Sequence, residues 1–187
     1  MILGKAKAGN SFLGETSRST TYPVEINGKT YTLHDTVGLG EYSGGTVNNA
    51  QAVRNLYRLV TDLSNTGGIN LLVFVIKHGQ KPTETMRKHY HLFHHGFCNS
   101  KVPIVIVVTG CGNMAPNMDV WWTDNEAGFT KAGLLFNGHT CICAGKEPRT
   151  RNGRYRNEDH FEDSATTAKQ LIFQHCMLDG WKKVRHS

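Results

Sequence analysis

Apolar and polar residues alternate in two neighbouring stretches of the chain, "TYPVEI" (21–26) and "KTYTLHD" (29–35). Strict alternation is typical of β-strands with one covered face. Asn27-Gly28, which joins the two stretches, supplies the positive φ angles of a tight turn. The pattern therefore predicts an antiparallel hairpin.

Two other stretches are almost continuously apolar, "INLLVFVIK" (69–77) and "VPIVIVVTG" (102–110). Strands covered on both faces have this composition. "HTCICA" (139–144) is a further predicted strand. Before the first glycine-rich loop only Met1–Leu3 is strand-like, although a strand there is normally central in a doubly wound sheet. We therefore expect a truncated first strand, or a sheet that lacks part of its middle.

Apolar residues at helical spacing predict three helices between these strands. They cover 52–63, a crossover after Pro82 with apolar residues at 86, 90, 93 and 97, and 163–176 with Asp163 or Ser164 as N-cap. The alternation of strands and helices predicts an α/β fold. We expect a doubly wound, mainly parallel sheet with one antiparallel edge hairpin, in one domain over 1–178 followed by a basic tail over 179–187.

The amino-acid composition limits the classes of protein to which the chain can belong. No apolar run reaches the roughly 18 residues that a membrane span needs, and no signal segment opens the sequence. Five cysteines, an odd number, favour reduced thiols and a cytoplasmic location. Cys141 and Cys143 share one face of a predicted strand, but no second cysteine pair completes a zinc site, so buried thiols are the favoured interpretation.

The net charge is +6, and much of it lies in "GKEPRTRNGRYR" (145–156) and "WKKVRH" (181–186). These segments are either solvated surface or a contact for an anionic partner, a nucleic acid or a lipid surface. Only Tyr155 is interleaved with the arginines, so single-stranded nucleic acid is the less favoured partner.

"LGKAKAGNSFLGE" (3–15) has the glycine spacing of a phosphate-binding loop, in which backbone N–H groups and a helix start bind phosphate oxygens. Gly4, Gly9 and Ser11 fit three positions of the pattern, with Ser11 as a Mg²⁺ ligand. Asn10 stands where the pattern has lysine. The alternative is a glycine-rich turn without a ligand.

A second motif follows in "YTLHDTVGLG" (31–40), where Asp35 and Gly38 form D-x-x-G at the end of a strand. In GTPases such an aspartate holds Mg²⁺ through a water, and the glycine N–H meets the γ-phosphate. The motif alone is also compatible with an ordinary turn. Its position after a glycine loop, a Thr-bearing segment and a hairpin makes it more specific.

The chain resembles small GTPase domains, and most closely the immunity-associated (GIMAP-like, septin-related) P-loop GTPases and similar fungal G-domain proteins. The resemblance covers residues 3–176 and rests on short segments. One of them, "MDVWW", contains a Trp pair after the predicted strand at 102–110. These segments are "GNSFLGE", "DTVGLGEYSGG", "GINLLVFVIKHG", "VPIVIVVTG" and "MDVWW".

The resemblance implies binding of GTP or GDP with Mg²⁺, and nominally GTP hydrolysis. Asp35 and Gly38 would meet the metal and the γ-phosphate, and Thr20 or Thr21 would be the switch threonine. Thr109 would begin the base-recognition segment, and residues 143–146 would lie near the base. Relatives of this type often pair across their nucleotide faces, which implies a possible homodimer or another protein partner.

Departures from the family pattern predict weak function. The lysine is missing when Gly4 opens the phosphate loop, and it is also missing when "GNSFLG" is taken to follow the loop, as it does in the immunity-type GTPases. Gly112 stands where a guanine-binding segment needs an acidic residue. A lost hydrogen bond to a charged group costs about 1.5–3 kcal/mol. We therefore expect weak GTP binding and poor or absent hydrolysis. The alternatives are a G-domain relative that serves as a protein-interaction module, and a basic binder of nucleic acid or another anionic surface.

The segment "KHYHLFHHGF" (88–97) contains four histidines, of which His91 and His95 lie one helical turn apart. Such a pair can bind one metal ion. Tyr90 and Phe93 are needed for packing, so the favoured interpretation is a polar helix face with histidines at the rim or in water.

Overall fold

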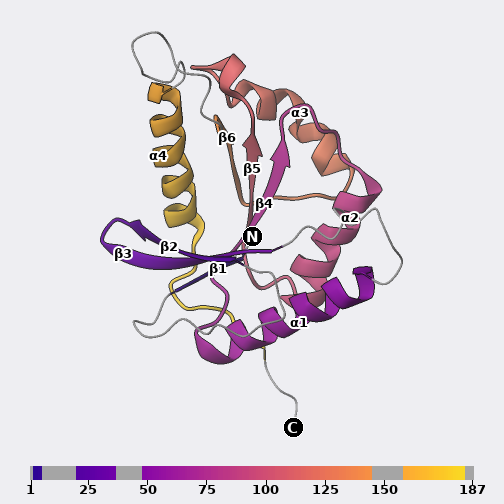
Figure 1. Cartoon of the computed structure of the whole chain (residues 1–187). Helices are drawn as coiled ribbons and strands as arrows, with labels where there is room; N and C mark the ends of the chain where they lie inside the picture. The colour runs from indigo at the N-terminus through magenta and orange to yellow at the C-terminus, as the bar shows by residue number, and fades with distance from the viewer. Residues whose placement is uncertain (1, 6–19, 37–47, 145–157, 184–187) are drawn as a thin grey trace. The chain divides into compact units, whose positions relative to one another are not determined.

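The computed structural model describes residues 2–5, 20–36, 48–144 and 158–183 (Figure 1). The chain divides into two compact units, each built from separated segments. The first unit comprises 1–72, 88–103 and 176–187, and the second comprises 73–87 and 104–175. No helix among the described residues is long and apolar enough to cross a membrane.

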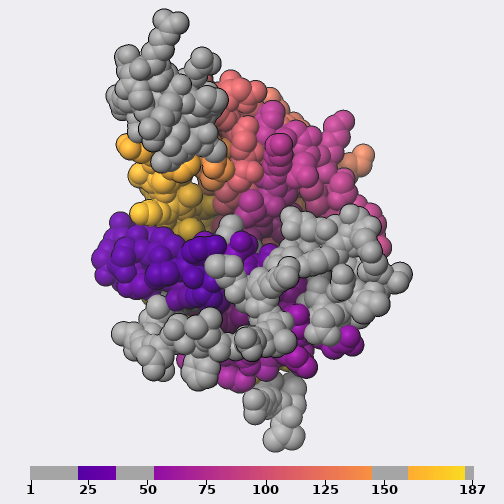
Figure 2. All heavy atoms as spheres, in the orientation of Figure 1, coloured from indigo at the N-terminus to yellow at the C-terminus, as the bar shows by residue number. Residues whose placement is uncertain are grey.

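The predicted hairpin is confirmed in the first unit. Strands β2 (Thr20–Ile26) and β3 (Lys29–Asp35) pair antiparallel, and the turn residues Asn27 and Gly28 have φ angles of 50° and 72°. Both angles are positive, as a two-residue hairpin turn of type I′ requires. Figure 2 shows the hairpin, in indigo, at the molecular surface. Its buried apolar residues are Ile26 and Tyr31.

The first strand differs from the sequence-based expectation. Strand β1 (Ile2–Lys5) pairs antiparallel with β3, and antiparallel with the first residues of β4 (Leu71–Lys77). A doubly wound nucleotide-binding sheet would have this strand parallel to its neighbours, so the prediction of a mainly parallel sheet is wrong at this point. A short apolar run looks the same when read in either direction, and its pattern therefore cannot specify the direction of pairing.

Helix α1 (Asn48–Thr66) starts before and ends after the predicted range 52–63. Leu56 and Val60 are buried as expected, but Tyr57 is 47% exposed and lies outside the core. The helix ends where Gly67 and Gly68 donate their N–H groups to Leu63 O, at 3.1 and 2.7 Å. Gly68 has a φ of 85°, the left-handed conformation that commonly ends a helix.

The segment after the last helix packs in the first unit. Ile69 and Trp181 exchange two backbone hydrogen bonds of 2.9 Å. Lys183 donates from Nζ to Tyr57 Oη at 3.2 Å and lies over the tyrosine ring. Within the expected basic tail over 179–187, these contacts attach the chain as far as Lys183.

The second unit contains the predicted parallel sheet. Strand β4 is followed in the hydrogen-bonded order by β5 (Ile104–Thr109) and β6 (Gly138–Ile142), and the three strands run parallel. Residues 104–108 are all buried, as a strand covered on both faces should be. Val75 in β4 is 40% exposed, so the continuous apolar run of this strand does not imply complete burial.

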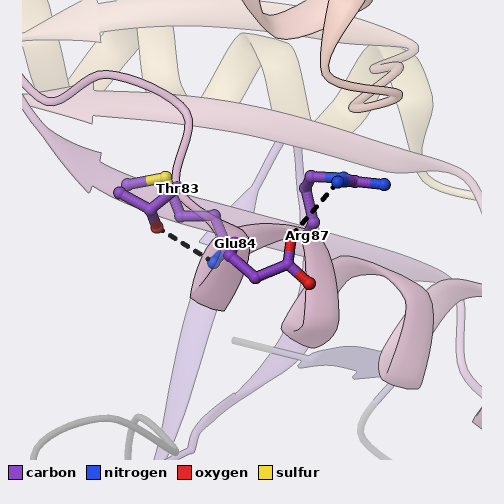
Figure 3. A network of polar contacts seen from close by, with 4 residues as sticks. Thr83, Glu84 and Arg87 are labelled. Carbon is purple, nitrogen blue, oxygen red and sulfur yellow. Dashed lines mark hydrogen bonds and ion pairs between the residues drawn. The ribbon is translucent and has the colours of Figure 1, made fainter.

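Helix α2 (Glu84–Tyr90) begins with a side-chain cap (Figure 3). Thr83 Oγ1 accepts a hydrogen bond from the Met86 N–H at 3.2 Å, and Glu84 pairs with Arg87 at 3.1 Å. The cap satisfies one of the N–H groups that the first helical turn leaves unpaired. An exposed ion pair of this kind contributes little, so the threonine is the main local signal for the helix start.

The crossover predicted as one regular helix changes type along its length. Residues His91–Phe97 form a π-helix (η1), and Cys98 N donates to Phe93 O at 3.1 Å, the i to i+5 pattern. Tyr90 and Phe97 are buried as predicted. Phe93, which the α-helical spacing also places on the inner face, is only half-buried.

Two longer helices follow β5 and β6 in the second unit. Helix α3 (Val120–Lys131) buries Trp121, Trp122 and Phe129. Helix α4 (Glu158–His175) begins before the predicted cap, so the assignment of Asp163 or Ser164 as N-cap is wrong. Ser164 Oγ instead donates to the carbonyl one turn earlier, at His160, a local bond that serine forms inside helices as well as at their ends.

Candidate nucleotide-binding site

Only part of the glycine loop and only part of the D-x-x-G motif lie within the described residues. Gly9, Asn10, Ser11 and Gly38 lie outside them. Gly4 is inside β1, where its Cα is opposite Thr32, and Lys5 is opposite Tyr31. Asp35 is three residues beyond Thr32 along β3, which corresponds to about 10 Å. The chain therefore leaves β1 at the end remote from Asp35.

The two candidate switch threonines occupy different positions of the hairpin. Thr21 is opposite His34, and its Oγ1 is 3.5 Å from His34 Nδ1. Thr20 is the residue opposite Asp35. Successive residues of a strand point to opposite faces, so Thr21 and Asp35 do not share a face of the hairpin. By backbone register, Thr20 and not Thr21 is the residue opposite the aspartate.

His34 lies on the same hairpin, half-buried beside Thr21. Burial lowers the pKa of its imidazole, because desolvation disfavours the charged form. Asp35 itself is exposed. An exposed carboxylate at the end of a strand is available to an incoming ion, although it has no fixed cation partner among the described residues.

In the second unit, the carboxyl ends of β5 and β6 come together. Thr109 is opposite Ile142 in the parallel register, and Cys111 N donates to Ile142 O at 3.1 Å. A Cβ added to Gly112 would lie 2.9 Å from Cys143 Sγ. The segments that the resemblance assigns to base recognition are thus adjacent, at the edge of a parallel sheet where ligands of α/β proteins bind.

Thr109 already uses its side chain within the fold. Its Oγ1 donates to Ile76 O at 3.1 Å, and its carbonyl accepts from His78 N at 2.7 Å. These bonds fasten the end of β5 to the end of β4. The residue thereby positions the segment that follows it, beginning with Gly110, whose φ is 81°.

Asp119 is the first acidic residue after Gly112, and its side chain also makes a hydrogen bond within the fold. Its Oδ1 accepts a hydrogen bond of 2.7 Å from the backbone N–H of Cys141. Cys141 is in β6, the last strand in the hydrogen-bonded order. The carboxylate thus satisfies a backbone donor on the outer edge of the strand, and this bond was not foreseen from the sequence.

Ser164 fixes the segment directly after β6. Its Oγ accepts from Cys143 N at 2.9 Å and donates to His160 O at 2.6 Å. The buried hydroxyl thus accepts one hydrogen bond and donates another, which links α4 to the residue after β6. The sequence predicted a helix cap at this serine, because capping is the commoner role of serine near a helix start.

A cavity of about 430 Å³ lies beside this part of β6. Two carboxylates and one imidazole contribute to it, with apolar walls from the segment before α3. Its described lining consists of Pro116, Asn117, Met118, Asp119, Val120, Thr123, Cys141, His160, Asp163 and Thr167. No lysine or arginine is among these residues, so the described lining is not suited to a phosphate group.

Burial reduces the reactivity of the cysteine thiols. Burial raises the pKa of Cys141 and of Cys111, and it raises the pKa of Cys98 to about 12. The thiolate is the reactive form, so these groups are poor nucleophiles at neutral pH. None of the five cysteines forms a disulfide bond with another. Among the described residues no group of three or more His, Cys, Asp or Glu side chains is arranged to hold a metal ion.

Comparison of the chain with protein-family models, with curated proteins and with solved structures found no match. The resemblance to small GTPase domains therefore rests on the residues quoted for it.

Proposed function

We propose that the chain is a G-domain-type protein that binds guanine nucleotide weakly and hydrolyses it slowly or not at all. The observation that carries the proposal is the adjacency of the segments after β5 and β6, through the Cys111 N to Ile142 O bond of 3.1 Å. In the related GTPases these two segments hold the base. The exposed Asp35 at the end of β3 supplies a carboxylate of the type that holds Mg²⁺ through water.

The expected affinity follows from the groups that are missing. Asn10 cannot supply the charge of a phosphate-loop lysine, which weakens binding by about 1.5–3 kcal/mol. Gly112 has no carboxylate for the guanine N–H groups. The carboxylate of Asp119 already accepts a hydrogen bond of 2.7 Å from Cys141 N. Transition-state stabilisation by positive charge is lost with the lysine, so hydrolysis suffers more than binding.

The second candidate is a protein-interaction module that keeps a G-like fold without a nucleotide. A specific observation favours it. Strand β1 runs antiparallel to β3, with Gly4 opposite Thr32, about 10 Å along the strand from Asp35. A nucleotide needs the phosphate loop and the metal-binding carboxylate on the same side, so this register is better suited to a chain that no longer binds one.

A titration with fluorescent GDP and GTP analogues, with and without Mg²⁺, distinguishes the two candidates. Weak but saturable and Mg²⁺-dependent binding is expected for the first. Asp35→Ala should remove the Mg²⁺ dependence, whereas Asp62→Ala, an equal loss of charge at an exposed position of α1, should not. If no binding is detected at millimolar nucleotide, the protein-interaction module is the remaining candidate. Submicromolar affinity with rapid turnover would contradict the predicted weakness.

A further inference from the structure

Three histidines and a tyrosine form a compact group in the first unit, which we call the histidine cluster: Tyr90, His91, His94 and His95. Tyr90 is 2% exposed, and its ring centroid lies 5.3–5.9 Å from the three imidazoles. His95 has its centroid 4.9 Å from that of His91 and 4.9 Å from that of His94. Neither of the proposed functions uses these side chains.

The outer pair has the spacing of two ligands of one ion. His91 and His95 are both exposed, with an interplanar angle of 31°. Two imidazoles that bind one ion at about 2.1 Å, with an angle of about 90–110° at the metal, have centroids roughly 4.6–5.3 Å apart. The 4.9 Å separation falls within this range.

His95 also has the partner that a metal-binding histidine usually has on its other nitrogen. Its Nδ1 is hydrogen-bonded to Ser100 Oγ. When Nδ1–H is the donor in this bond, the lone pair of Nε2 remains for a metal, and the ring orientation is fixed. Asn99 and Ser100 have φ angles of 49° and 56°, an uncommon conformation for residues other than glycine. The turn thus holds the hydroxyl beside the imidazole.

His94 is not a third ligand. Its Nδ1 is buried without a hydrogen-bond partner in the described structure, and burial lowers the pKa of its imidazole, with a further contribution from His95. In the part of the chain that the structure describes, no three side chains of suitable type are arranged for one ion. A metal in this place would have two protein ligands, and water would complete its coordination.

We propose that His91 and His95 bind one divalent transition-metal ion, with Ser100 as a positioning residue. Imidazole suits Zn²⁺, Cu²⁺ and Ni²⁺, whereas Mg²⁺ and Ca²⁺ prefer oxygen ligands. We assign Zn²⁺ as the ion, and Cu²⁺ serves as a tighter-binding spectroscopic probe. The site is separate in sequence from Asp35 and Thr109, and it does not depend on nucleotide.

The test uses the full chain without a polyhistidine tag. Zn²⁺ is titrated in competition with a chromophoric chelator. We expect one ion per chain, and a loss of affinity of at least about tenfold in His91→Ala and in His95→Ala. Ser100→Ala should weaken binding about tenfold, the lower end of the effect of such supporting groups. His89→Ala, a half-buried neighbour outside the pair, should bind within twofold of the wild type.

Far-UV circular dichroism verifies that each variant is folded, and Cu²⁺ electron paramagnetic resonance provides an independent measurement. Nitrogen couplings from two imidazoles are expected in the wild type and from one in either histidine variant. Unchanged Zn²⁺ affinity in both variants, or no Zn²⁺ binding by the wild type, would overturn the proposal. Either result is independent of whether guanine nucleotide binds.

Discussion

Replacing Asp119 by alanine tests how the end of the parallel sheet is held together. The substitution removes the acceptor of the Cys141 N–H, which is 2.7 Å from Asp119 Oδ1. Cys141 is 3% exposed, so its N–H has little access to water as a substitute. A hydrogen bond to a charged group contributes about 1.5–3 kcal/mol. Because Asp119 itself is exposed, we expect a loss near the lower limit, about 1.5 kcal/mol.

Thermal unfolding followed by circular dichroism measures this loss. For a chain of this length, a loss of about 1.5 kcal/mol lowers Tm by roughly 3–6 °C. Asp119→Asn keeps an oxygen acceptor without the charge and should lose less. Hydrogen exchange of the Cys141 amide should accelerate in Asp119→Ala. Asp124→Ala, at an exposed position of α3, the helix that Asp119 precedes, is the matched control. If its Tm equals that of Asp119→Ala, the hydrogen bond does not stabilise β6.

Three further predictions concern packing, backbone conformation and pH. Phe129 is 1% exposed and its ring lies 5.2 Å from that of Trp122, so Phe129→Ala should lose about 3–5 kcal/mol of unfolding free energy in urea; a loss under 1 kcal/mol would contradict the packing. Gly68→Ala adds a Cβ 2.4 Å from backbone atoms of Gly180 at a φ of 85°, whereas Gly79→Ala at a φ of 83° meets no atom within 4 Å. In calorimetry Gly68→Ala should therefore be much the less stable, and equal Tm values would be inconsistent with the close approach. Burial lowers the pKa of His34, so its contribution to stability is present above the ordinary pKa of about 6.5 and is lost as the pH falls below it; urea unfolding at pH 7.5 and 5.5 should show a smaller difference in His34→Gln than in the wild type.

Local sequence signals were sufficient for the elements whose causes are local. The Asn27-Gly28 turn predicted the hairpin because only a few residue types tolerate two successive positive φ angles. The apolar run of residues 104–108 predicted a covered strand, and these residues are buried. Helix ends were less accurate, since Ser164 can bond within a helix as readily as cap one.

The candidate site was predicted less completely. Asp35 was proposed because it ends a strand in D-x-x-G spacing, but the sequence paired it with a glycine loop that begins at the remote end of β1. The role of Asp119 was not predictable, because its partner is the backbone of Cys141, 22 residues later. The sequence does not indicate which side chain will accept a hydrogen bond from a given backbone N–H.

The sequence by itself determined the alternation of strands and helices and the parallel sheet formed by β4, β5 and β6. These properties depend on residue type and on spacing along the chain. Only the tertiary structure decided the direction of β1, the engagement of Asp119 by Cys141, and the 4.9 Å approach of His91 and His95. Each of these depends on the partner that folding brings to a residue. Short apolar runs, carboxylates and imidazoles can each accept several partners with similar free energy, and the packing of the whole chain selects among them.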